Sequence, residues 1–140
     1  YVKEGTFPGW DILFLEKDIH IPADDVEYEV ITQEGRTRLK AYETPLTYMK
    51  KLKEEEQYAG EKGMTPEEWI LFANYVAANH GQVIDDYQNK GKINFLTGAI
   101  FASGRVPDGF WIQGNAQANL YWLDTDDQGV SRGFRPALKM

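Results

Sequence analysis

The chain contains no cysteine, which excludes disulfide bonds, thiolate metal sites and cysteine nucleophiles. Histidine and serine are scarce as well, because only His20, His80, Ser103 and Ser131 occur. Neither serine lies in a Gly-x-Ser-x-Gly sequence, so no serine nucleophile at a strand-to-helix turn is predicted. Two isolated histidines without cysteine do not predict a zinc site. These absences argue against the common forms of covalent and zinc-dependent catalysis.

Long apolar runs and a surplus of basic residues are also missing. No stretch approaches the roughly 18 apolar residues of a membrane-spanning helix, so we expect no membrane insertion. The net charge is -7, whereas binding nucleic-acid phosphates requires clustered lysine and arginine. We therefore expect no nucleic-acid partner, with an acidic inhibitor that mimics nucleic acid as an alternative. No signal peptide is recognisable, and a start at Tyr1 rather than methionine suggests processing or truncation.

The residues that are present suffice for one folded domain. Hydrophobic residues make up 42% and aromatic residues 14% of the 140 residues, more than a disordered chain would contain. Near the N-terminal end, alternating apolar and polar residues predict strands, with a hairpin over residues 26–42. We expect residues 1–43 to form an N-terminal β extension, with His20 in a strand, and residues 44–140 to form the main domain.

Two helices are predicted in the middle of the chain. The first begins at Thr44-Pro45, where a threonine cap precedes proline at the first helical position, and it ends at Gly60 or Gly63. Its apolar face is expected to carry Leu46, Met49 and Leu52. The second begins at the capping box Thr65-Pro66-Glu67-Glu68 and ends at Gly81.

Short strands follow the helices. The apolar stretches 93–96 and 99–101 predict strands, and Pro107-Asp108-Gly109 predicts a turn. Three more strands are expected over residues 110–112, 119–124 and 131–138. This order predicts an α+β fold with both helices on one side of an antiparallel sheet.

Aromatic side chains are the strongest chemical signal. Phe110, Trp111, Tyr121, Trp122 and Phe134 are close in sequence, and successive residues of a strand face opposite sides. We expect Trp122 and Phe134 in the core and Trp111 and Tyr121 on the surface, where tyrosine and tryptophan mark interfaces and sugar-stacking sites.

Polar side chains accompany these aromatics. Amides offer donors and acceptors together, which suits sugar hydroxyls or peptide backbone, although ordinary turn chemistry explains them equally well. The predicted ligand contacts are Trp111, Gln113, Asn115, Asn119, Tyr121 and Asp124. Arg135 is expected instead to be the buried partner of a carboxylate, with a role in stability rather than binding.

Residues 124–129 resemble the start of a calcium loop, with Asp124 and Asp126 as weak metal candidates. The twelfth position of a complete EF-hand loop requires a bidentate glutamate and here is Arg135. An acidic hairpin turn is therefore favoured, and we expect no cofactor, with calcium as the alternative. Adjacent carboxylates such as Asp126-Asp127 leave a glycosidase as another alternative.

Three motifs resemble prokaryotic and phage C-type-lectin-like domains, including their formylglycine-generating-enzyme-like branch. They are Met64-Thr65-Pro66-Glu67-Glu68-Trp69, Phe110-Trp111-Ile112 and Arg132-Gly133-Phe134-Arg135-Pro136-Ala137-Leu138. The resemblance implies a C-type-lectin-like fold over residues 44–140. It does not imply formylglycine-generating activity, which needs cysteines. Calcium-dependent sugar binding is not implied either, because Leu123 replaces an amide ligand in Trp122-Leu123-Asp124.

The resemblance implies a non-enzymatic binding module that recognises a protein or glycan receptor at a cell or virion surface, outside the cell. A structural or assembly protein of a phage or surface appendage is the main alternative. In that case residues 1–43 would pair with a neighbouring chain, and the protein would form a homo-oligomer.

Overall fold

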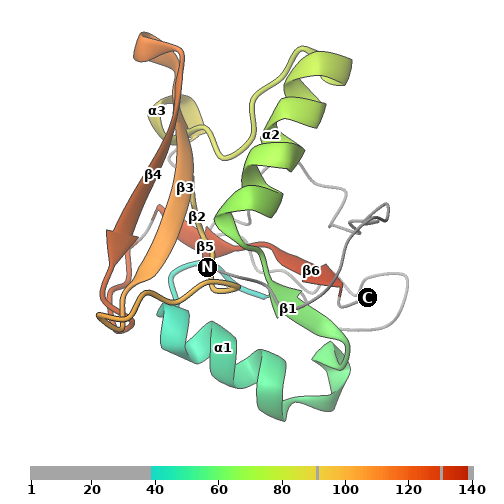
Figure 1. Ribbon diagram of the computed structural model, residues 1–140, viewed down its shortest axis with the longest axis vertical. Coiled ribbons are helices and arrows are strands. Elements are labelled where there is room, and N and C mark those ends of the chain that lie inside the picture. Colours follow the sequence, from blue (N-terminus) through green and yellow to red (C-terminus); the bar gives the residue numbers. More distant parts are fainter. Residues whose placement is uncertain (1–38, 91, 130, 139–140) are drawn as a thin grey trace.

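The computed structural model describes residues 39–90, 92–129 and 131–138, and there the protein is α+β, as predicted (Figure 1). In chain order the elements are α1 (Pro45–Glu54), the 3-10 helix η1 (Glu56–Tyr58), β1 (Glu61–Gly63), α2 (Pro66–His80), α3 (Tyr87–Lys90), β2 (Ile93–Phe95), β3 (Val106–Ile112), the 3-10 helix η2 (Gln113–Asn115), β4 (Gln117–Leu123), β5 (Arg132–Phe134) and β6 (Pro136–Leu138). The predicted β extension, including His20, falls almost entirely outside the described residues. Residues 39–42 are described and are not in a strand, so the predicted hairpin over 26–42 was wrong at its end.

The described strands form two sheets. The larger one has the order β4-β3-β2-β5, and the smaller one pairs β1 with β6. Within the larger sheet β3 is antiparallel to β2 and β4, but β5 runs parallel to β2. The prediction of a purely antiparallel sheet was therefore wrong. The predicted last strand over 131–138 divides at Arg135, because its two halves pair in different sheets.

Helix α2 matches its predicted limits. Thr65 Oγ1 accepts a hydrogen bond from the Glu68 amide at 3.2 Å, and the Glu68 carboxylate accepts one from the Thr65 amide at 2.9 Å. Gly81 ends the helix in the left-handed conformation with φ 61°, which glycine adopts without the steric cost of a Cβ.

Helix α1 begins as predicted but ends earlier. The Thr44 hydroxyl accepts a hydrogen bond from the Thr47 amide at the start. The last helical residue is Glu54 rather than a residue next to Gly60 or Gly63, because residues 61–63 pair with β6. The predicted apolar face was right at Leu52, which packs against the cluster around Tyr48, and wrong at Leu46, which is exposed.

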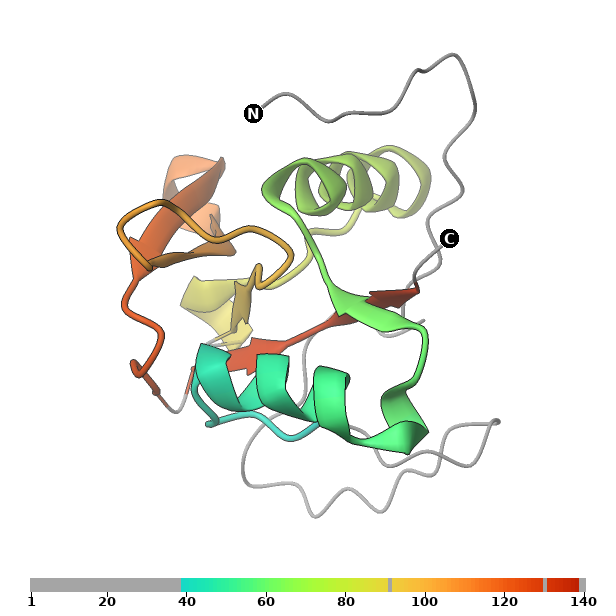
Figure 2. The ribbon, with the colours of Figure 1, turned by 60° about the horizontal axis from the view of Figure 1, so that its bottom comes forward.

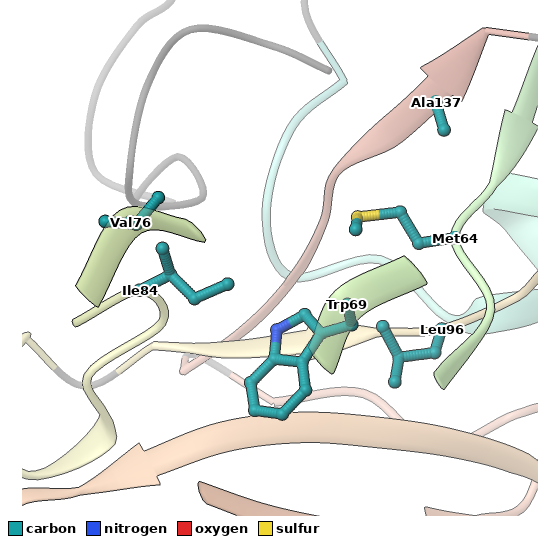
Figure 3. Packing of buried hydrophobic residues seen from close by; sticks show 6 residues of the cluster. All are labelled: Met64, Trp69, Val76, Ile84, Leu96 and Ala137. Carbon is teal, nitrogen blue, oxygen red and sulfur yellow. The ribbon is translucent and has the colours of Figure 1, made fainter. Parts of the chain in front are cut away.

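The helices pack on opposite faces of the larger sheet (Figure 2), and the prediction that they share one side was wrong. On the α1 face the Tyr48 ring stacks on Phe134, with ring centroids 4.9 Å apart. On the α2 face Figure 3 shows the second apolar cluster, formed by Met64, Trp69, Val76, Ile84, Leu96 and Ala137. Phe95 of β2 and Phe134 of β5 belong to the first cluster, whereas Ala137 of β6 belongs to the second.

A buried polar network joins the second cluster to the C-terminal strands. Arg135 Nη2 donates to Asp85 Oδ1 at 2.8 Å, and Trp69 Nε1 donates to Asp85 Oδ2 at 2.8 Å. The Arg135 guanidinium also lies over the Phe72 ring, 5.2 Å from its centroid. Arg135 is 1% exposed, which confirms the prediction that it is the buried partner of a carboxylate.

Candidate binding surface

The predicted contact residues lie on the long hairpin of β3 and β4 at one side of the molecule (Figure 1). Its register runs from Val106 opposite Leu123 to Ile112 opposite Gln117. Pro107-Asp108-Gly109, predicted as a turn, lies buried inside β3. The neighbours explain this error: the Pro107 carbonyl accepts from the Leu96 amide at 2.8 Å, and a Cβ on Gly109 would lie 2.7 Å from the Trp69 indole.

The hairpin is attached to the rest of the fold along its length. The Trp111 amide donates to the Asp85 carbonyl at 3.0 Å, next to the carboxylate that Trp69 and Arg135 hold. At the tip, Gln88 Oε1 accepts from the Gly114 amide at 2.6 Å. These contacts fix the position of the hairpin relative to the rest of the fold.

The six predicted contact residues are spread along the hairpin rather than gathered in one place. Gln113 and Asn115 are exposed at the tip in η2, and Asp124 follows β4 at the opposite end. Because the seven residues of β4 extend over roughly 20 Å, the tip and Asp124 do not share a small-ligand site. Half-buried Trp111 pairs with Ala118, and half-buried Asn119 with Phe110.

Tyr121 and Trp122 form a stacked, solvent-exposed aromatic pair. Their ring centroids are 5.3 Å apart and their planes differ by 7°. Tyr121 is 56% exposed, as predicted for a surface residue, but Trp122 is 49% exposed, so its prediction as a core residue was wrong. The rings can approach each other because, among the described strands, β4 lies at the edge of the sheet, which leaves its outer side open for both side chains. Phe134 is buried as predicted.

Other exposed apolar side chains were missed from the sequence. Leu120 directly precedes the aromatic pair and is 43% exposed. Ile100 and Phe101, predicted in a strand, lie in the loop between β2 and β3 and are exposed. Once the edge position of β4 is known, its unbroken Leu-Tyr-Trp sequence is the signal that could have identified this surface.

The acidic segment after β4 forms a turn whose polar groups make hydrogen bonds within the turn and to neighbouring residues. Asp127 Oδ2 accepts from the Asp124 amide at 3.1 Å, and Arg105 Nε donates to Asp124 Oδ1 at 3.1 Å. The Thr125 carbonyl accepts from the Leu46 amide of α1 at 3.0 Å. Among the residues that the structure describes, no three carboxylate or histidine side chains are grouped to hold a metal ion. The hydrogen bonds of Asp124 and Asp127 are those of an acidic turn.

Asp108 is buried in β3, directly opposite Tyr121 of β4. Its side chain is 2% exposed, and Arg132 Nε is 3.9 Å from Asp108 Oδ2. Within the described part of the chain Asp108 Oδ1 has no hydrogen-bond partner. Burial raises the pKa of Asp108 from 3.8 to about 6, against the opposing effect of Arg132. A raised pKa is a property of catalytic acids. The Asp108 carboxyl, however, is covered by the fold, so its ionisation lowers the stability of the protein.

Over the described residues, no helix combines the length and the apolar character that crossing a bilayer requires. No family model, no curated protein and no solved structure matches this chain.

Proposed function

We propose that this protein is a non-enzymatic binding module that recognises a protein or glycan at a cell or virion surface through the β3–β4 hairpin. The observation that carries the proposal is the run of exposed apolar side chains at Leu120, Tyr121 and Trp122. Exposed aromatics in a contiguous group are typical of interaction sites. At protein interfaces tyrosine and tryptophan are among the residues whose truncation costs most binding energy.

The immediate surroundings suit recognition of polar ligands. Tyr121 and Trp122 present flat rings to solvent, and Asn119 lies two residues before Tyr121 on the same strand. Ring faces pack against the apolar face of a sugar or against apolar side chains, while the amide supplies both a donor and an acceptor. The attachment of β3 to Asp85 supports a rigid platform for these contacts.

A C-type-lectin-like fold is part of the same proposal. The three motifs that carry the resemblance all fall in ordered elements: residues 64–69 lead into α2, residues 110–112 end β3, and residues 132–138 form β5 and β6. The α+β architecture supports this assignment without being specific to it.

The test is binding of labelled protein to a panel of intact cells and to a glycan array, with calcium and with chelator. Tyr121→Ala/Trp122→Ala should weaken binding at least 30-fold, which corresponds to about 2 kcal/mol. Leu71→Ala/Tyr75→Ala removes a comparable exposed pair from α2 and should bind as the unaltered protein does. Equal binding by both double variants, or no binding by the unaltered protein, would overturn the proposal.

A further inference from the structure

The outer edge of β4 presents unpaired backbone groups in a known pattern. The Leu96 amide donates to the Pro107 carbonyl, and the Trp111 amide donates to the Asp85 carbonyl, so the odd-numbered residues of β3 direct their backbone groups away from β4. By alternation, the even-numbered residues of β3 exchange hydrogen bonds with β4. The register places these opposite residues 117, 119, 121 and 123. The N–H and C=O groups of Ala118, Leu120 and Trp122 therefore point outward.

This edge lacks the features that usually prevent strands from pairing. Exposed edge strands in monomeric proteins commonly carry lysine, proline or a bulge, whereas the sequence Gln-Ala-Asn-Leu-Tyr-Trp-Leu of β4 has no charge and no proline. The register with β3 is continuous over all seven residues, so β4 contains no bulge. In the part of the chain that the structure describes, no strand pairs with the outer side of β4.

We propose that the outer edge of β4 pairs antiparallel with β4 of a second copy of this chain, about a two-fold axis at Leu120. In this register Leu120 faces the partner's Leu120, and Ala118 faces the partner's Trp122. These are the residues whose backbone groups point outward in both copies, so each of the three facing pairs exchanges two hydrogen bonds, about six in all. If the register shifted by one residue, the outward backbone groups of one copy would face residues of the other copy whose backbone groups are already hydrogen-bonded to β3.

The side chains fit the same register. Each Trp122 lies beside the partner's Ala118, and each Tyr121 lies beside the partner's Asn119. The short partners leave room for one ring on each sheet face, and large-beside-small pairs pack well across neighbouring strands. The rings stack across the free edge of β4 in the single chain, so pairing turns the Tyr121 ring to one sheet face and the Trp122 ring to the other, where both stay accessible to a ligand.

Charge favours this edge over other surfaces for self-association. Each copy carries a net charge of -7, and like charges at a contact are unfavourable, but β4 itself is uncharged. Continued beyond the strand ends, the register places the acidic turn 124–127 of one copy beside the tip 113–116 of the other. That tip carries amides and no charged residue, so carboxylates meet hydrogen-bond donors rather than other carboxylates.

A single cysteine tests both the dimer and its register, because the chain has no cysteine of its own. In the proposed dimer the two Leu120 Cα atoms are about 5.5 Å apart, within disulfide range. Leu120→Cys should therefore form a disulfide-linked dimer under mild oxidation. Ala118→Cys is the matched control on the same exposed edge, because its Cα lies roughly 13 Å from the equivalent atom, four residues along the strand, and it should cross-link at least tenfold more slowly.

Sedimentation equilibrium of the unaltered protein completes the test. We expect a reversible monomer–dimer equilibrium, weakened at least tenfold by Ala118→Pro, which removes an outward amide without affecting the bonds to β3. A monomer at every concentration, equal cross-linking by the two cysteine variants, or an undiminished Ala118→Pro dimer would each overturn the proposal. Tyr121 and Trp122 are intact in all three variants, so a failure here is distinguishable from failure of the proposed ligand binding.

Discussion

The buried carboxyl of Asp108 gives a prediction that can be worked out from the structure. Its side chain is 2% exposed, and its nearest cation, Arg132 Nε, is 3.9 Å away. The pKa of Asp108 is raised from 3.8 to about 6, and this value already includes the attraction of Arg132. We predict that Asp108→Asn, which removes the ionisation and keeps the shape, stabilises the protein at pH 8.

Proton binding by Asp108 determines whether the free energy of unfolding rises or falls with pH. Between pH 3.8 and about 6 the folded protein holds a proton on Asp108 that the unfolded chain has released, so rising pH lowers the free energy of unfolding through this window. Each pH unit between the two pKa values contributes about 1.4 kcal/mol, which gives about 3 kcal/mol in total. The variant should match the unaltered protein near pH 4 and exceed it by up to about 3 kcal/mol above pH 7.

The assay is urea unfolding of both proteins from pH 4 to pH 8, followed by circular dichroism. The difference in the free energy of unfolding between the two proteins at each pH removes the contributions of other titrating groups. Asp124→Asn is the control, because it makes the same substitution at an exposed carboxyl. A stability difference for Asp108→Asn that is constant across this range, or that falls as pH rises, would refute the reasoning.

Three further predictions concern the core and the helix caps. Arg135→Leu should lower the free energy of unfolding by about 3–5 kcal/mol, because Asp85 would remain as an uncompensated buried charge; denaturant unfolding measures this, and a loss below about 1 kcal/mol would contradict it. Gly109→Ala should destabilise by at least about 1–3 kcal/mol, since a Cβ would lie 2.7 Å from Trp69, and an unchanged melting temperature would contradict this. Thr65→Ala should cost about 1 kcal/mol through loss of the helix cap, whereas Thr65→Ser, which keeps the hydroxyl, should restore most of it in the same measurement.

The features predicted correctly are those that depend on neighbours in sequence. Helix α2 is fixed by Thr65, Pro66 and Glu68 at one end and Gly81 at the other, and each acts within one helical turn. The burial of Arg135 was also predicted, but its partner Asp85, 50 residues away in the sequence, was not.

The errors arose where contacts distant in sequence override local preference. Pro107, Asp108 and Gly109 are turn residues by composition, but Gly109 is needed where the Trp69 indole approaches β3. Proline is tolerated at 107 because its missing amide would face Leu96, just after β2, whose carbonyl accepts from the Ala99 amide instead. Strand order is not encoded in local periodicity either, so the edge position of β4, and with it the exposure of Trp122, could not be read from the sequence.

The pairing of β5 with β2 and of β6 with β1 has a consequence for how the chain folds during synthesis. Residues 132–138 complete both sheets and supply Arg135, the counter-charge to Asp85. Until the ribosome has released this segment, the growing chain carries an uncompensated carboxylate and two incomplete apolar clusters. The native fold thus depends on contacts between segments far apart in sequence, which slow folding, and a ribosome stalled before residue 132 would hold a nascent chain suited to chaperone capture.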